Sequence, residues 1–173
     1  MGKENIQFIV ADVTHTEAAQ KVSDWVSADG AMLPKSPDEI LDIFRKGHAV
    51  VGYDGNEPVV HAALTQVNSD QTVEIGSLFT EESHRNKGLA REAVIAVLGQ
   101  GKSLYPDHII YAVANERSAP LFKKMGAREM QTDELGGEVW ASCDTCPRKP
   151  EQAENCPFTC CDTPFDLTHI TSE

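Results

Sequence analysis

The chain has 173 residues, 40% of them hydrophobic, which is enough for one domain with a buried core and argues against a disordered chain. Asp and Glu number 27 against 15 Lys and Arg, and the net charge of -12 argues against binding to nucleic acid or anionic lipid. No apolar run approaches transmembrane length and residues 1–5 lack the apolar stretch of a signal peptide, so we expect a cytoplasmic protein without membrane contact.

Strand-like and helix-like segments alternate along the chain. Short apolar, β-branched runs predict the strands, and apolar residues at helical spacing predict the helices. In chain order we predict a strand at 6–13, helices at 14–27 and 36–46, strands at 48–53, 58–67 and 73–80, a helix at 89–100, a strand at 108–114, a helix ending at Gly126, and a final hairpin of 128–132 and 138–142. This order predicts an α/β fold with a mixed central sheet flanked by helices.

A short glycine-containing segment joins the strand predicted at 73–80 to the helix predicted at 89–100, and its sequence is Arg85-Asn86-Lys87-Gly88-Leu89-Ala90. A turn at a helix start gathers backbone N–H groups at one point, where they can hold a pyrophosphate. Gly88 lets the backbone approach a phosphate closely, and Arg85 and Lys87 add positive charge. The alternative is an ordinary tight turn that opens a surface helix.

The segment is followed, after the strand predicted at 108–114, by a run that begins Asn115-Glu116-Arg117-Ser118-Ala119 and ends at Ala127. Over residues 74–127 this order resembles the core of the GNAT superfamily of acetyl-CoA-dependent N-acetyltransferases, with its R/Q-x-x-G-x-G/A and N-x-x-A-x-x-x-Y-x-x-x-G-F motifs. The resemblance implies the GNAT fold, acetyl-CoA as cosubstrate, and its pyrophosphate at residues 85–90.

The same resemblance implies where the rest of the cofactor lies. The backbone of Leu78, Phe79 and Thr80, at the end of a predicted strand, would hold the pantetheine arm. The Asn115 amide would hydrogen-bond to the cofactor, since it can both donate and accept. A strand-ending or helix-capping asparagine is the alternative for Asn115.

Acetylation of an amine needs a base, because the ammonium must lose a proton before it attacks the thioester. Glu74 interrupts an apolar strand, and its spacing to Arg85 equals that of the general-base Glu in the histone-acetyltransferase branch of the superfamily. The resemblance therefore implies that Glu74 is the base, and partial burial would raise its pKa toward useful values. A glutamate that faces solvent or pairs with Lys is the alternative, and His61 and His84 are other titrating groups.

Phe122 stands where the superfamily often has the tyrosine that protonates the departing CoA thiolate. A phenyl ring can pack against the cofactor but cannot donate a proton. Tyr111, Ser118 or water would then supply the proton, or the thiolate would leave unaided. This departure leaves open a catalytically silent acyl-CoA-binding module.

Residues 30–36 resemble the loop before the second helix in the acetyltransferase domains of N-acetylglutamate synthases. In the superfamily this region walls the acceptor pocket, which places Met32, Leu33 and Lys35 near the acceptor, and Lys35 could bind a carboxylate. We expect an N-acetyltransferase that acts on a small primary amine or amino acid. Acetylation of protein lysines or N-termini is the alternative, and the sequence leaves a homodimer open.

All 5 cysteines lie within residues 143–161, in two close pairs with one further adjacent Cys. Such pairs can bring four sulfurs to a tetrahedral metal, and a metal would supply the folding free energy that this apolar-poor segment lacks. Disulfides, disfavoured by the odd count, and a redox dithiol are the alternatives. We predict a GNAT-like domain at 1–142 and a zinc-stabilised extension at 143–173. The predicted zinc ligands are Cys143, Cys146, Cys156 and Cys160, with Cys161 as the rival for the fourth position and His169 as a remote substitute.

Overall fold

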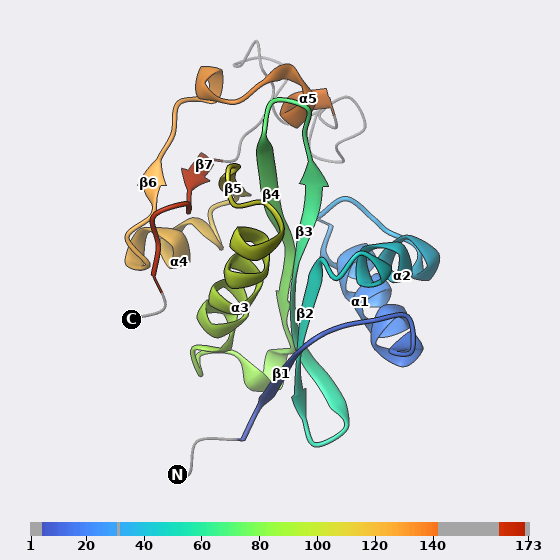
Figure 1. Ribbon diagram of the computed structural model, residues 1–173. Helices are drawn as coiled ribbons and strands as arrows, with labels where there is room; N and C mark the ends of the chain where they lie inside the picture. Colours follow the sequence, from blue (N-terminus) through green and yellow to red (C-terminus); the bar gives the residue numbers. More distant parts are fainter. Residues whose placement is uncertain (1–4, 31, 142–162, 172–173) are drawn as a thin grey trace.

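The computed structural model describes residues 5–30, 32–141 and 163–171, and in these ranges seven strands form one sheet (Figure 1). The sheet order is β1-β2-β3-β4-β5-β7-β6. Neighbouring strands are antiparallel except for β4 and β5, which are parallel. The strands are β1 (Gln7–Val10), β2 (Ala49–Asp54), β3 (Glu57–Val67), β4 (Thr72–Thr80), β5 (Ile109–Ala114), β6 (Arg128–Glu129) and β7 (Thr163–Asp166). The predicted mixed α/β sheet is confirmed.

Helices cover both faces of the sheet (Figure 1). On one face α1 (Thr16–Asp29) and α2 (Pro37–Arg45) bury apolar residues such as Val22 and Phe44 against β2 and β3. On the other face α3 (Leu89–Leu104) packs against β2 to β5, and α4 (Ala119–Lys124) joins this core through Phe122. No helix in the described ranges is long and apolar enough to cross a membrane.

The predicted start of α2 is confirmed in detail. Ser36 Oγ accepts a hydrogen bond from the Glu39 N–H at 3.3 Å, and the Glu39 carboxylate accepts one from the Ser36 N–H at 2.7 Å. This reciprocal capping box satisfies two N–H groups at the helix start, and Pro37 occupies the first turn, where its missing N–H costs nothing. The cap fixes where the loop before α2 ends, next to Lys35.

The predicted final hairpin is wrong. Only Arg128–Glu129 is a strand, and the chain then forms a short 3-10 turn (Thr132–Glu134) and the helix α5 (Gly137–Trp140). The apolar residues Met130, Leu135 and Val139 pack around the buried Tyr111 instead of alternating along strands. The sheet is completed by β7, which lies within residues 143–173 and pairs with β5 and β6.

Removal of the Phe165 ring should destabilise the whole domain, although β7 lies near the end of the chain. Phe165 is fully buried and its ring stacks on Phe122, with 5.8 Å between ring centroids. We expect Phe165→Ala to lower the free energy of unfolding by about 3–5 kcal/mol in urea titrations. Ile109→Ala, at a position that is 42% exposed, is the control and should cost less than about 1 kcal/mol. Equal losses in the two variants would mean that β7 does not belong to the cooperative core.

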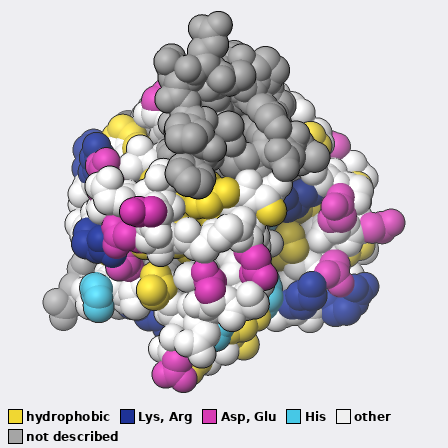
Figure 2. All heavy atoms as spheres, turned by 90° about the horizontal axis from the view of Figure 1, so that it is seen from above, with side chains coloured by type: hydrophobic (Ala, Val, Ile, Leu, Met, Phe, Trp, Pro, Cys, Tyr) yellow, Lys and Arg dark blue, Asp and Glu magenta, His cyan; other side chains and the backbone are white. Residues whose placement is uncertain are grey.

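Acidic side chains are spread over the described part of the face in Figure 2, in keeping with the net charge of -12. Lysines and arginines lie among them on this face. The net charge of the protein therefore does not predict the local charge at a binding site, which depends on the side chains around that site.

Candidate active site

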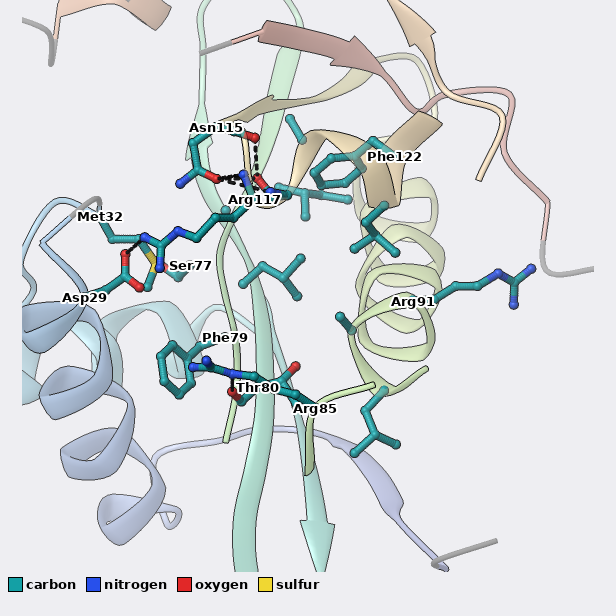
Figure 3. A pocket seen from close by; sticks show the side chains of 18 of the residues that line it. Asp29, Met32, Ser77, Phe79, Thr80, Arg85, Arg91, Asn115, Arg117 and Phe122 are labelled. Carbon is teal, nitrogen blue, oxygen red and sulfur yellow. Dashed lines mark hydrogen bonds and ion pairs between the residues drawn. The ribbon is translucent and has the colours of Figure 1, made fainter. Parts of the chain in front are cut away.

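A cleft opens where the two parallel strands of the sheet separate. β4 and β5 pair only from Thr72 to Glu74, opposite Ile109 to Tyr111. Beyond Glu74 the two strands diverge, and β5 continues beside β7. A cavity of about 500 Å³ lies between them, walled also by the starts of α3 and α4 and the end of α1 (Figure 3).

A β-bulge bends β4 along this cleft. His61 of β3 lies opposite Phe79 and Ala63 lies opposite Gly76, so β4 contains one extra residue between these pairs. Ser77 adopts a φ of 49°, a left-handed conformation that is costly for a residue with a Cβ. The bulged residues Ser77 and Leu78 have no partner in the register with β3 and both line the cleft, and the Ser77 carbonyl lies 2.8 Å from His61 Nδ1.

The start of α3 closes one end of the cleft. Asn86 and Gly88 have φ values of 62° and 83°, and this loop turns the chain into the helix. The first helical hydrogen bond runs from the Glu92 N–H to the Gly88 carbonyl, so the N–H groups just before Glu92 have no carbonyl partner within the helix. A Cβ added at Gly88 would meet no atom within 4 Å. The loop therefore presents N–H groups and the positive end of a helix dipole to open space.

Arg85 is held beside this loop by the end of β4. Its Nε donates a hydrogen bond to the Thr80 carbonyl at 3.0 Å, and its guanidinium lies 5.6 Å from the centroid of the Phe79 ring (Figure 3). The Phe79 ring stacks on Trp25 of α1 at 4.8 Å. A fixed positive charge therefore lies next to the N-terminus of α3, where an anion would be favoured.

Asn115 organises the opposite wall. Its Oδ1 accepts hydrogen bonds from the N–H groups of Arg117 and Ser118, at 3.0 and 3.1 Å. Asn115 directly follows β5, and its side chain therefore holds the turn that precedes α4, whose N-cap residue is Ser118. Arg117 also reaches across the cleft to Asp29 at the end of α1, with 3.0 Å between Nη2 and Oδ1 (Figure 3). This pair joins the two walls of the cleft.

Glu74 lies outside the cavity, at the last position where β4 and β5 pair. Val73 and Ile75 pack on the α3 side, so Glu74 between them faces the opposite side of the sheet. Its Oε2 accepts a hydrogen bond from Thr65 Oγ1 at 2.8 Å. Burial raises the pKa of Glu74, while the Thr65 hydroxyl and the charge of Lys35 lower it in part. The carboxyl therefore holds a proton more readily than an exposed glutamate does.

The alternative bases and acids already have hydrogen-bond or ion-pair partners. His84 lines the cavity, but its Nε2 pairs with Asp54 at 3.1 Å, and His61 is fully buried behind Ser77 and does not line the cavity. The Tyr111 hydroxyl is buried and accepts a hydrogen bond from Asn68 at 3.1 Å, and burial raises its pKa, so it is a poor proton donor. Ser118 Oγ donates to Asn115 Oδ1 at 3.2 Å.

Most of the predicted cofactor residues come together in one cavity although they are far apart in sequence. Lys87 and Glu74 do not line it, and neither do Leu33 and Lys35, which were predicted near the acceptor. The predicted residues that line the cavity are Leu78, Phe79, Thr80, Arg85, Asn86, Gly88, Leu89, Ala90, Asn115 and Phe122. Sequence reasoning missed Asp29, Ser77 and the ion-pairing role of Arg117, because their contacts join distant segments.

The predicted zinc site cannot be placed in this cleft or elsewhere. Cys143, Cys146, Cys156, Cys160 and Cys161 lie outside the described residues. Among the residues that are described, no group of His, Cys, Asp and Glu is arranged to hold a metal ion.

Comparisons with known proteins agree with this geometry. The sequence pattern of the Acetyltransferase (GNAT) family matches residues 18–127, which is more than half of the chain. An uncharacterized N-acetyltransferase of Chlorobaculum tepidum is 25% identical over 142 residues, covering 80% of this chain and 86% of the relative.

Solved structures share the fold at low sequence identity. N-acetylglutamate synthase of Neisseria gonorrhoeae, solved with coenzyme A and N-acetyl-glutamate, superposes with a TM-score of 0.68 at 12% identity, over 93% of this chain and 34% of that protein. The chain therefore spans about a third of that synthase. Diaminobutyrate acetyltransferase of Paenibacillus lautus, solved with L-2,4-diaminobutyric acid and coenzyme A, gives 0.64 at 13% identity, over 94% of this chain and 93% of that protein.

Proposed function

The chain belongs to the GNAT acetyltransferase family, and from this premise we propose that it transfers the acetyl group of acetyl-CoA to the primary amine of an amino acid. The observation that carries the proposal is the cleft between β4 and β5, which has the N-terminus of α3 at one end and the half-buried carboxyl of Glu74, with its raised pKa, where the strands part. The phosphates and the reacting amine need these two kinds of group.

The cofactor would lie along β4. Its pyrophosphate would accept hydrogen bonds from the N–H groups of residues 86–90, with Arg85 beside it. The pantetheine arm would follow the bulge of β4 toward Ser77, which brings the thioester to the point where the two strands diverge. Asn115 would keep its Oδ1 on the N–H groups of Arg117 and Ser118 and offer its amide N–H groups to the cofactor.

The reaction begins with loss of a proton from the acceptor ammonium to Glu74. Because Glu74 does not line the cavity, a water molecule would carry this proton. The amine nitrogen then attacks the thioester carbonyl and gives its second proton to water, the carbon–sulfur bond breaks, and CoA leaves as a thiolate. Phe122 cannot protonate the thiolate and Tyr111 holds its own proton tightly, so solvent water would supply the proton.

The charges beside Glu74 favour an acceptor that carries both an amine and a carboxylate. Lys35 lies near enough to Glu74 for its charge to lower the pKa of that carboxyl. An amino acid could place its ammonium toward Glu74 and its carboxylate toward Lys35. The complexes of structural neighbours with N-acetyl-glutamate and L-2,4-diaminobutyric acid support an acceptor of this size.

An assay of CoA release over amino acids, polyamines, aminoglycosides and peptides tests the proposal. We expect turnover with amino acids, and we expect Lys35→Gln to raise the KM for the amino acid while Lys35→Arg preserves it. Turnover with peptides alone would favour a protein acetyltransferase. Tight acetyl-CoA binding without turnover of any amine would favour a silent acyl-CoA-binding module.

We also propose a structural zinc ion bound by Cys143, Cys146, Cys156 and Cys160, which rests on the spacing of the cysteines in the sequence. Protein purified without added metal should contain about one zinc per chain, and chelation should lower its melting temperature. Cys160→Ser should lose the zinc, whereas Cys161→Ser, the matched control, should keep it. Protein that contains no zinc, and whose melting temperature does not change on chelation, would exclude this site.

A further inference from the structure

We propose that His61 is a positioning residue, which holds the bulge of β4 so that the Leu78 N–H points toward the acetyl carbonyl. This inference rests on the proposed acetyl transfer and assigns a role to a buried side chain that the proposed mechanism does not otherwise use.

Within the described part of the chain, the His61 side chain makes one polar contact, and that contact is with the bulge. Its ring is fully buried and its Nδ1 lies 2.8 Å from the Ser77 carbonyl oxygen. A carbonyl oxygen only accepts, so Nδ1 must carry the hydrogen. Burial lowers the pKa of His61 to about 4, so near neutral pH the ring keeps this single proton.

The other ring nitrogen indicates that packing alone does not explain why a histidine occupies this position. Nε2 is buried without a hydrogen-bond partner among the described residues. An unsatisfied buried polar atom lowers stability, and an apolar side chain of similar size would avoid that cost. The Phe44 ring, 6.1 Å away between centroids, is an apolar neighbour that would accept such a side chain. The bond to Ser77 is therefore the distinguishing contribution of a histidine here.

The bond fixes the direction of one peptide group. In a trans peptide the C=O and the following N–H point in opposite directions. The Ser77 carbonyl points to His61, so the Leu78 N–H points away from β3, toward the side where β5 has separated. Neither Ser77 nor Leu78 has a partner in the register with β3, and both line the cavity.

An N–H group in that position could stabilise the negative charge that develops on the thioester oxygen. Ser77 has a disfavoured φ of 49°, which neighbouring contacts must maintain. Without the His61 donor the Ser77–Leu78 peptide could rotate and turn its carbonyl oxygen toward the cleft. The acetyl group would then meet an acceptor in place of a donor.

Three substitutions separate this role from packing. The amide nitrogen of Asn can occupy the place of Nδ1, the amide nitrogen of Gln extends toward the place of Nε2, and Leu keeps volume without a donor. We expect His61→Asn to keep kcat within about threefold, and His61→Gln and His61→Leu to lower kcat about 10- to 100-fold with little change in the KM for acetyl-CoA. His61→Leu should melt at or above the wild-type temperature, because it removes the unsatisfied Nε2.

A readout without turnover separates failure of this inference from failure of the proposed function. In NMR spectra the Leu78 amide proton should shift more on binding acetyl-CoA than on binding CoA, in the wild type and His61→Asn but not in His61→Leu. If the wild type shows this shift but acetylates no amine, the proposed function is wrong, and the positioning role of His61 is still supported. An unchanged kcat in His61→Leu, an equal loss of kcat in all three variants, or a Leu78 shift that persists in His61→Leu would overturn the positioning role.

Discussion

Replacement of Gly88 with aspartate should weaken acetyl-CoA binding by at least about 100-fold in titration calorimetry. A carboxylate at this position would lie where the structure offers helix N–H groups to a pyrophosphate. Two like unit charges about 4 Å apart near a protein surface repel by about 4 kcal/mol, which corresponds to a roughly 1000-fold loss of affinity. Screening by solvent and salt reduces this loss, so we expect at least about 100-fold.

Gly88→Asn is the matched control for charge. Asn and Asp have nearly the same shape, and both tolerate the left-handed backbone that Gly88 adopts at a φ of 83°. The open space around a Cβ at Gly88 admits either side chain. The asparagine variant should therefore bind acetyl-CoA much more tightly than the aspartate variant. Equal affinity of wild type and Gly88→Asp would place the pyrophosphate elsewhere.

Glu74→Gln should lower kcat/KM by about 10² to 10⁴, the usual contribution of a general base. Glutamine keeps an oxygen that can accept the Thr65 hydrogen bond, so the local structure should be preserved. The affinity for acetyl-CoA should stay unchanged, because Glu74 lies outside the cavity. A variant with native turnover and a native pH profile would remove Glu74 from the mechanism.

The raised pKa of Glu74 also fixes the sign of two pH effects. The base acts as a carboxylate, so the activity of the wild type should rise with pH through the raised folded-state pKa. The stability that Glu74 contributes is present below its unfolded-state pKa and is lost as pH rises through the folded-state pKa. Thermal melts should therefore show Glu74→Gln gaining stability relative to wild type between pH 4 and pH 8. An equal stability difference between Glu74→Gln and wild type at pH 4 and at pH 8 would mean that burial does not shift the pKa of this carboxyl.

The central part of the fold could be predicted from local patterns. The strands expected at 48–53, 58–67, 73–80 and 108–114 match β2 to β5 to within about one residue at each end. Continuous apolar runs between glycine-rich turns and helix caps mark these elements. The phosphate-binding loop proposed at residues 85–90 was also predictable, because Gly88 lies at a strand-to-helix junction.

β7 could not be predicted, because its four residues give no periodic signal and Pro164 argues against a strand between two others. Gly76 precedes the bulge, but the left-handed φ lies at Ser77, whose residue type does not indicate it, and the His61 contact comes from another strand. The Arg117–Asp29 pair joins residues 88 positions apart. Each of these features depends on tertiary contacts that a sequence window does not contain.

A crystal structure of the protein with acetyl-CoA tests the central claim most directly. We expect the pyrophosphate within hydrogen-bond distance of the N–H groups of residues 86–90, the pantetheine arm beside the bulge of β4, and the acetyl carbonyl next to the Leu78 N–H. A cofactor bound away from the N-terminus of α3, or an acetyl group outside the gap between β4 and β5, would contradict the account.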